Sequence, residues 1–258
     1  MSSEAIPEII IPEAMRPADG RFNSGPSKVR PEAVEHLAAA ASGYLGTSHR
    51  RDGVRSVVRR IREGMHDLFS LPDGYEVLLG NGGTTVFWDA AAFGLVKEQS
   101  EHLSFGEFSS KFADVVRAAP HLADPRVIDA PYGDHPEAVA DPDVDLYALT
   151  QNETSTGVAA PVVRPAGADG LVAVDATSAA GGMAVDATQF DCYYFAPQKC
   201  FGGDGGLWVA LCSPAAIERI ERIRASGRWI PTSIDLGVAL DNARQDQTYN
   251  TPALATLF

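Results

Sequence analysis

A lysine and an aspartate, each placed directly after an apolar run, have the clearest chemical potential in this sequence. Lys199 follows "YYFAPQ" and precedes Cys200, and Asp175 follows "LVAV". A lysine amine in an apolar setting has a lowered pKa and can form a Schiff base with a carbonyl. A carboxylate in such a setting can keep a heteroaromatic nitrogen protonated. Each residue alone also fits a simpler interpretation, a solvated charge for Lys199 and a cap for Asp175.

The segment "GNGGTT", residues 80–85, has the composition of a phosphate-binding turn. Gly82 and Gly83 allow a tight turn, the hydroxyls of Thr84 and Thr85 can cap, and the free N–H groups of a following helix attract a phosphate. The segment lacks the spacing of a Walker A loop and of a full GxGxxG motif. It therefore favours a cup for a single phosphate over a dinucleotide site, although a plain strand-to-helix turn also fits.

Three further residues have side chains suited to a planar or anionic ligand. Thr154 in "NETSTG" can donate to a ring oxygen, and Phe108 in "GEF" can stack on a planar cofactor. Arg50 in "TSHR" is a fork-shaped donor for a carboxylate or a phosphate. Taken singly, a turn, a core aromatic and a surface ion pair are the simpler interpretations.

The elements that must position these residues form an alternating pattern of helices and short apolar strands. Helical spacing covers residues 31–42, 54–70, 84–96 and 107–119, and strand candidates are 75–81, 101–106, 125–130, 144–150, 171–177, 192–197 and 207–212. Several strands are apolar on both faces, which predicts a three-layer α/β/α domain with a mostly parallel sheet. Ligands of such sheets bind beyond the carboxyl ends of the strands, where the residues above are found.

Composition excludes several other classes of function. The chain has 258 residues with 34 acidic and 21 basic side chains, a formal charge of −13, which argues against broad binding of nucleic acid. Cys192, Cys200 and Cys212 show no CxxC or secreted-type framework, and no HExxH pair indicates zinc. Residues 1–20 read as an extended segment without a signal peptide, and we expect a cytoplasmic protein without a membrane span.

Taken together, the glycine-rich turn, the stacking aromatic, the aspartate and the later lysine resemble the fold-type I enzymes that use pyridoxal 5'-phosphate. More narrowly, the sequence resembles the phosphoserine aminotransferases of class V in their actinobacterial form. The motifs that carry this resemblance, in chain order, are "FNSGPSKVRPEAV", "GTSHR", "GNGGTTVFWDAAAFGL", "GEFSSKF", "NETSTG", "VDATSAAGG", "FAPQKCFGGDGGLW" and "YNTPALATL".

The resemblance implies a role for each residue. Lys199 would hold the cofactor covalently and shuttle a proton between the substrate α-carbon and the cofactor C4′, and Asp175 would pair with the ring nitrogen. Phe108 would stack on the ring and Thr154 would touch its 3-oxygen side. The remaining cofactor contacts would come from the phosphate cup, formed by Gly83, Thr84, Thr85 and Gln198.

The resemblance also implies a homodimer with shared contacts. Asn250 and Thr251 would reach across the dimer to the cofactor phosphate of the neighbouring subunit. Ser24, His49 and Arg50 would border the substrate, with His49 and Arg50 meeting its anionic end. The substrates would be L-glutamate with 2-oxoglutarate, and 3-phosphohydroxypyruvate with 3-phosphoserine; a phosphohydroxythreonine of vitamin B6 synthesis is a further candidate.

Two departures from the family pattern affect this expectation. Thr85 stands in the turn where many relatives have an arginine. The sequence ends at Phe258, where the family continues into an interdomain helix and a small domain that supplies an arginine for the substrate α-carboxylate. We therefore expect residues 21–258 to form the cofactor-binding large domain, and to bind the cofactor with little or no turnover.

Two alternatives remain at this stage. Another class V enzyme, such as a serine or alanine–glyoxylate aminotransferase or a cysteine desulfurase, has the same cofactor elements. A non-catalytic nucleotide-binding module would use "GNGGTT" for a nucleotide phosphate and Lys199 as a counter-ion.

Overall fold

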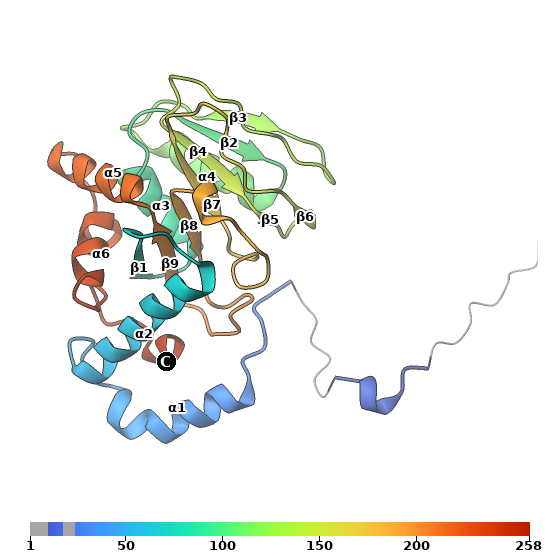
Figure 1. Cartoon of the computed structure of the whole chain (residues 1–258), viewed down its shortest axis with the longest axis vertical. Coiled ribbons are helices and arrows are strands. Elements are labelled where there is room, and N and C mark those ends of the chain that lie inside the picture. The colour runs from blue at the N-terminus through green and yellow to red at the C-terminus, as the bar shows by residue number, and fades with distance from the viewer. Residues whose placement is uncertain (1–9, 18–23) are drawn as a thin grey trace, which may run out of the picture.

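A seven-stranded sheet forms the middle layer of the molecule (Figure 1). The computed structural model describes residues 10–17 and 24–258. The strand order is β1-β9-β8-β7-β4-β2-β3; β9 runs antiparallel to β1 and β8, and all other neighbouring pairs are parallel. The strands are β1 (Glu76–Asn81), β2 (Ser100–Ser104), β3 (Arg126–Asp129), β4 (Leu146–Thr150), β7 (Leu171–Asp175), β8 (Cys192–Phe195) and β9 (Leu207–Cys212). The prediction of a mostly parallel sheet is confirmed, and all seven strand candidates are strands, with ends shifted by up to two residues.

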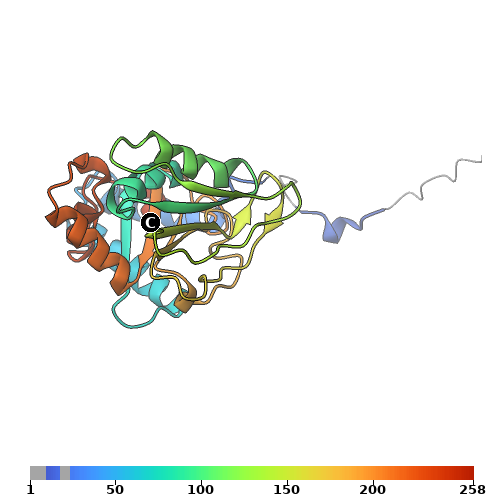
Figure 2. The same ribbon diagram turned by 90° about the horizontal axis from the view of Figure 1, so that it is seen from above.

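Helices cover both faces of this sheet, which explains why the central strands are apolar on both sides. The helices are α1 (Pro31–Tyr44), α2 (Asp52–Phe69), α3 (Thr84–Gly94), α4 (Glu107–Ala118), α5 (Pro214–Ala225), α6 (Leu236–Ala243) and α7 (Leu254–Leu257). Alternate residues of each strand pack into two cores: one core contains side chains of α3, α4, α5 and α6, and the other contains side chains of α2 and α7. Figure 2 shows α4 lying over one face of the sheet.

The start of α3 has a backbone that only glycine accommodates easily. Gly82 has a φ of 107°, and a Cβ there would lie 2.6 Å from Cγ2 of Val86. Gly83 is extended and provides the N-cap of the helix. The strand β1 can therefore turn into α3 within two residues, which brings the helix start to the carboxyl edge of the sheet.

Some elements were not predicted. A short ribbon of β5 (Asn152–Glu153) and β6 (Val158–Ala159) follows β4 within the "NETSTG" region, and α5, α6 and α7 lie in the last part of the chain. The predicted N-terminal segment 1–20 falls largely outside the described residues. Its described part, residues 10–17, contains one 3-10 turn at Glu13–Met15.

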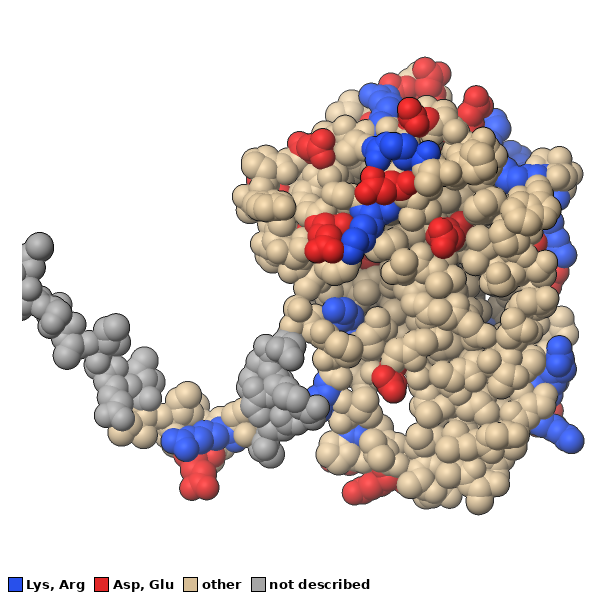
Figure 3. Space-filling view, turned by 180° about the vertical axis from the view of Figure 1, so that it is seen from behind, with Lys and Arg blue, Asp and Glu red and all other residues tan. Residues whose placement is uncertain are grey.

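The surface carries mixed charges. On the face that Figure 3 presents, the charged side chains gather toward one end and along the edge, and the rest of this face is mostly uncharged. Over residues 10–17 and 24–258, none of the helices is long and apolar enough to cross a lipid bilayer.

Candidate active site

Several of the predicted site residues lie where β7 and β8 end and α3 begins. Asp175 is the last residue of β7 and pairs in register with Thr150 of β4 and Tyr194 of β8. The N–H of Ala176 donates to the carbonyl of Tyr194, which keeps the two strands together past the end of β7. The register thus fixes Asp175 at the carboxyl edge, between two neighbouring strands.

The Asp175 carboxylate is buried, and its hydrogen-bond donors among the described residues are neutral groups. Oδ1 accepts from the backbone N–H of Thr177 at 2.9 Å, and Oδ2 accepts from the indole N–H of Trp88 at 3.1 Å. Burial raises the pKa of Asp175, the hydrogen bonds from Thr177 and Trp88 lower it, and the charge of Glu153 raises it further; the net direction is upward. A buried carboxylate in this condition gains from a cationic partner, such as a protonated ring nitrogen.

Lys199 lies in the turn that follows β8, against the N-terminal segment of the chain. Its Nζ donates to the carbonyl of Ser24 at 2.9 Å. The adjoining Gly25 has a φ of 115°, and a Cβ there would lie 2.6 Å from the Lys199 Nζ. The backbone N–H of Ser27 donates to the carbonyl of Gln198 at 2.6 Å. The structure therefore brings together Lys199 and Ser24.

Hydroxyl groups connect the Asp175 end of the site to the lysine turn. Thr177 Oγ1 donates to Thr84 Oγ1 at 2.8 Å. The hydroxyl of Thr154 and the side-chain amide of Asn152 both donate to Ser178 Oγ at 2.8 Å. This series of hydrogen bonds extends to the turn that carries Lys199, because the Cys200 thiol donates to the Ser178 carbonyl at 3.5 Å.

The start of α3 offers unused donors at the same place. The first hydrogen bonds within α3 are donated by the N–H groups of Val86 and Phe87 to the Gly83 carbonyl. The N–H groups of Thr84 and Thr85 come before them and have no acceptor within the helix. Thr84 is buried and Thr85 is exposed. Close by in sequence to Lys199, Gln198 Oε1 is buried with no hydrogen-bond partner among the described residues. Such a helix start suits a phosphate group.

Phe108 lies in the first turn of α4, and its ring is partly exposed, with Lys111 Nζ 5.2 Å from the ring centroid. A fully buried carboxylate fixes this turn. Oε2 of Glu153 accepts from the N–H groups of Phe108 at 3.0 Å and of Ser109 at 2.8 Å, and Oε1 accepts from the Ser155 N–H and hydroxyl. Glu153 thereby ties the loop that carries Thr154 to the helix that carries Phe108.

A second group of predicted residues surrounds a hollow of about 640 Å³. His49 is buried, and its Nδ1 lies 2.9 Å from Thr251 Oγ1. Burial lowers the pKa of His49, and the adjoining charge of Arg50 lowers it further, which favours the neutral ring. Arg50 also lines the hollow and is exposed. Asn250 is exposed beside Thr251.

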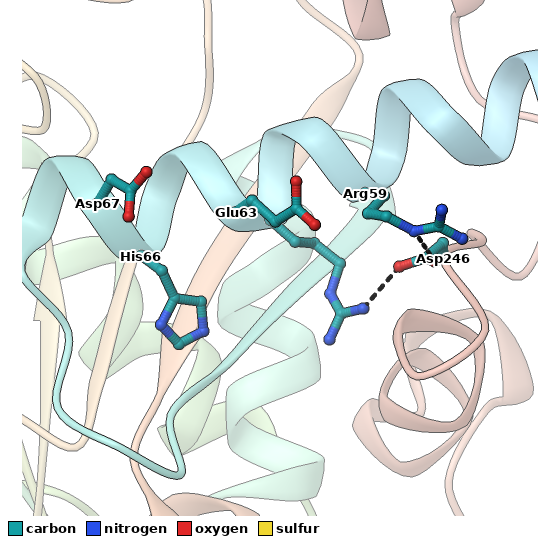
Figure 4. Close-up of a pocket in the computed structure, with 6 residues that line it drawn as sticks. Arg59, Glu63, His66, Asp67 and Asp246 are labelled. Carbon is teal, nitrogen blue, oxygen red and sulfur yellow. Dashed lines mark hydrogen bonds and ion pairs between the residues drawn. The ribbon is translucent and has the colours of Figure 1, made fainter.

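Another hollow, of about 390 Å³, has a different character (Figure 4). It lies along α2, and Asp246 there accepts hydrogen bonds from Arg59 and Arg62, both at 2.8 Å. Burial raises the pKa of Asp246, but the two arginines outweigh it and hold that pKa below its usual value. Because this carboxylate already has two cationic partners, we interpret the hollow as a structural ion-pair cluster.

Sequence reasoning missed two residues of the site, Trp88 and Glu153. Both lie inside motifs that were quoted, but nothing in their spacing shows which atom they bind. The sequence contained one signal for Glu153, namely the glycine at position 106. A Cβ on Gly106 would lie 2.3 Å from the Glu153 Cγ, so only glycine leaves room for this side chain. The glycine before α4 is therefore a sign of a close neighbour.

The fold is that of an aminotransferase. The chain belongs to the class V aminotransferase family, whose model matches residues 21–256. A more particular similarity is to phosphoserine aminotransferase of Rhodococcus jostii (strain RHA1), which is 60% identical over 249 residues. That match covers 96% of this chain and 67% of the Rhodococcus protein.

Solved structures agree with this assignment. The crystal structure of a phosphoserine aminotransferase from Cytophaga hutchinsonii superimposes with a TM-score of 0.84 at 28% identity, over 91% of this chain and 67% of that chain. A pyridoxal phosphate-bound phosphoserine aminotransferase from Trichomonas vaginalis has the same fold, with a TM-score of 0.72 at 21% identity, over 92% of this chain and 67% of that one. The chain thus spans about two thirds of the length of the proteins it matches.

Proposed function

We propose that this chain carries the cofactor site of a phosphoserine aminotransferase. The reaction transfers the amino group of L-glutamate to 3-phosphohydroxypyruvate and gives 3-phospho-L-serine and 2-oxoglutarate. The observation that carries the proposal is the buried Asp175, which lacks a cationic partner among the described residues and is connected through Thr177 and Ser178 to the turn of Lys199. The 60% identity to the Rhodococcus enzyme supports the choice of substrates.

The residues at this edge of the sheet fit pyridoxal 5'-phosphate. The N–H groups of Gly83, Thr84 and Thr85 would hold the phosphate, with Gln198 beside them, and Asp175 would pair with the ring nitrogen. Phe108 offers a partly exposed ring for stacking, and Thr154 a hydroxyl for the ring oxygen. When bound, the cofactor supplies a carbonyl that accepts the amino group and a ring that withdraws electrons.

Lys199 has two tasks in this proposal. Its amine would hold the cofactor, and it would move a proton between the substrate α-carbon and the cofactor C4′. The Ser24 carbonyl, which accepts from Nζ at 2.9 Å, holds the amine in place between these steps. Asp175 would keep the ring nitrogen protonated, because a protonated nitrogen withdraws electrons most strongly.

Arg50 and His49 would meet the anionic end of both substrates. The chain has a net charge of −13, so its overall field repels a phosphorylated substrate, and local donors must hold it. The exposed guanidinium of Arg50 provides the permanent charge, while His49, whose lowered pKa favours the neutral ring, contributes a hydrogen bond. One site must accept a carboxylate from glutamate and a phosphate from the ketoacid, which favours such adaptable donors.

We further propose a homodimer in the cytoplasm. Asn250 and Thr251 are exposed, and they are therefore accessible to the cofactor phosphate of a neighbouring subunit, although the Thr251 hydroxyl also contacts His49. The cytoplasmic assignment rests on the three cysteines, which form no disulfide in the described structure. Phosphohydroxythreonine of vitamin B6 synthesis remains a second substrate to test.

The test compares ketoacids side by side. Purified protein is loaded with the aminated cofactor, pyridoxamine 5'-phosphate, and the rates with 3-phosphohydroxypyruvate, glyoxylate and oxaloacetate are measured in single turnovers, because the ratio of these rates is defined even where turnover is slow. We expect the phosphorylated ketoacid to react at least about tenfold faster, the discrimination that one charge-assisted contact provides. A preference for glyoxylate would contradict the proposed substrate, and a protein that retains a nucleotide but no cofactor would contradict the reaction.

A further inference from the structure

Trp88 reaches from α3 to the carboxylate at the end of β7. Its indole Nε1–H donates to Asp175 Oδ2 at 3.1 Å, and both residues are buried, Trp88 being 4% exposed. The rest of the Trp88 ring packs in the core between α3 and the sheet. The indole N–H is the only hydrogen-bond donor of a tryptophan side chain, and here it is directed at a buried carboxylate. Trp88 can therefore influence the position and the charge of that carboxylate.

Two contacts, one helical turn apart, join α3 to the exit of β7. Thr84 and Trp88 are four residues apart and lie on the same side of the helix. Thr84 accepts from Thr177, and Trp88 donates to Asp175. The helix whose first N–H groups form the phosphate cup therefore also holds the aspartate, and its rigid backbone sets the spacing between the two.

We propose that Trp88 is a positioning residue, which keeps the Asp175 carboxylate ionised and aims its free lone pairs at the ring nitrogen of the cofactor. The inference rests on the function proposed above. A carboxylate accepts about four hydrogen bonds, so the bonds from Thr177 and Trp88 leave capacity for a third donor. Trp88 acts through Asp175 and takes no part in the chemistry itself.

The surroundings of Asp175 explain why such a donor is needed. Burial and the charge of Glu153 both favour the protonated acid, and the donors of Thr177 and Trp88 oppose them. Tyr194, which faces Asp175 from β8, has a buried hydroxyl without a partner among the described residues. Without the indole donor, Asp175 would protonate more readily, and a neutral acid cannot keep a ring nitrogen protonated.

Two matched substitutions test the proposal. Trp88→Phe removes the donor and keeps an aromatic ring in the core. Trp208→Phe is the control, because Trp208 of β9 is equally buried at 3% exposure and also packs on Phe87. Dissociation constants are measured for pyridoxal phosphate and for its 1-deaza analogue, which has a carbon in place of the ring nitrogen.

We expect Trp88→Phe to weaken binding of pyridoxal phosphate about tenfold, the value of one hydrogen bond to a charged group. Binding of the deaza analogue should change less than about twofold in the same variant, because the analogue has no nitrogen for Asp175 to meet. Trp208→Phe should leave both constants within about twofold. An equal loss for both compounds, or no loss for pyridoxal phosphate, would overturn the role of Trp88.

A second measurement uses the wild-type protein without cofactor, in case Trp88→Phe does not fold. Nuclear magnetic resonance resolves the indole N–H signals of the three tryptophans. The Trp88 signal should shift as Asp175 titrates, and should lose its downfield position in Asp175→Asn. If the chemical shift of the Trp88 indole N–H is the same in Asp175→Asn as in the wild type, the proposal is overturned. If the wild-type protein binds no pyridoxal phosphate at all, the proposed function fails; if it binds and Trp88→Phe binds equally well, only this inference fails.

Discussion

Asp175 and Asp246 are two buried carboxylates of one chain, and their surroundings shift their pKa values in opposite directions. Asp246 has two arginine partners at 2.8 Å, and its pKa lies below the usual value. Asp175 has only neutral hydrogen-bond donors among the described residues, and its pKa lies above the usual value. The first charge is satisfied within the chain and serves stability. The charge of Asp175 has no cationic partner among the described residues, which is the physical basis for proposing that it pairs with a ligand.

The contrast extends to the backbone around each residue. Asp246 has a φ of 56°, in the left-handed region, just after α6, and its arginines come from α2. Its cluster thus ties the end of one helix to the side of another. Asp175 ends a strand, and the residues after it face a helix start with unused donors. We therefore expect mutation of Asp246 to change the stability of the fold, and mutation of Asp175 to change the binding of a ligand.

The largest effect is expected for Asp175→Asn. The amide keeps the shape of the side chain but cannot pair as an anion with a protonated ring nitrogen. Affinity for pyridoxal phosphate should fall about 10²-fold, the usual consequence of removing one partner of a buried charged pair. The measurement is a spectroscopic titration with the cofactor. The matched control, Asp246→Asn, should bind the cofactor as the wild type does, and similar losses in both variants would remove the distinction between the two carboxylates.

Glu153→Gln should mainly destabilise the protein. The amide of glutamine would face N–H donors that now point at a carboxylate oxygen, and the start of α4 would lose a buried negative charge. The free energy of unfolding should fall by about 2–3 kcal/mol. Urea unfolding of the cofactor-free protein measures it. A change below about 0.5 kcal/mol would mean that Glu153 does not hold the Phe108 turn.

Asp246→Asn should cost about 1–3 kcal/mol at pH 7 and leave the left-handed backbone acceptable, since asparagine tolerates it. The cost depends on pH with a definite sign. The folded pKa of Asp246 is depressed, so its ion pairs stabilise the fold above the unfolded value of about 4, and that stability is lost as pH falls through the folded pKa. Unfolding experiments from pH 7 to pH 2.5 should show the two proteins converging at the acid end. A difference that grows on acidification would contradict the ion-pair interpretation.

The smallest effect is expected for Glu107→Gln on the surface of α4. Glu107 pairs with Lys111 one turn later, and its side chain is 63% exposed. Exposed pairs of this kind contribute about 0.3–0.5 kcal/mol, and salt screens them. The variant should therefore unfold within about 0.5 kcal/mol of the wild type, in contrast to Glu153→Gln. A larger loss would show that the charge of the α4 start is not supplied by Glu153 alone.

Much of the fold could be predicted because it follows from local patterns. Apolar runs such as 171–175 and 207–212 mark strands buried on both faces, and Gly82 with Gly83 marks the turn into α3. The ribbon of β5 and β6 was missed because each of its strands has only two residues, too few for any periodicity.

The site was predictable in the residues that end strands and much less in those that support them. Lys199 and Asp175 stand out by their position after apolar runs. Trp88 looks like any core aromatic of α3, and its role depends on which atom lies 3.1 Å from its indole nitrogen. That distance follows from the packing of α3 on β7, which no local pattern contains. The roles assigned to Phe108, Thr154, Asn250 and Thr251 stay predictions that binding experiments must test.

The most direct test of the central claim is to locate the cofactor on the chain. The protein is incubated with pyridoxal phosphate, reduced with borohydride, digested and analysed by mass spectrometry, with Lys199→Arg as the matched variant and Lys111→Arg as the control. We predict one stable adduct, on the peptide that contains Lys199, present in the control and absent from Lys199→Arg. An adduct that persists in Lys199→Arg, or that falls mainly on another lysine, would contradict the assignment of this site.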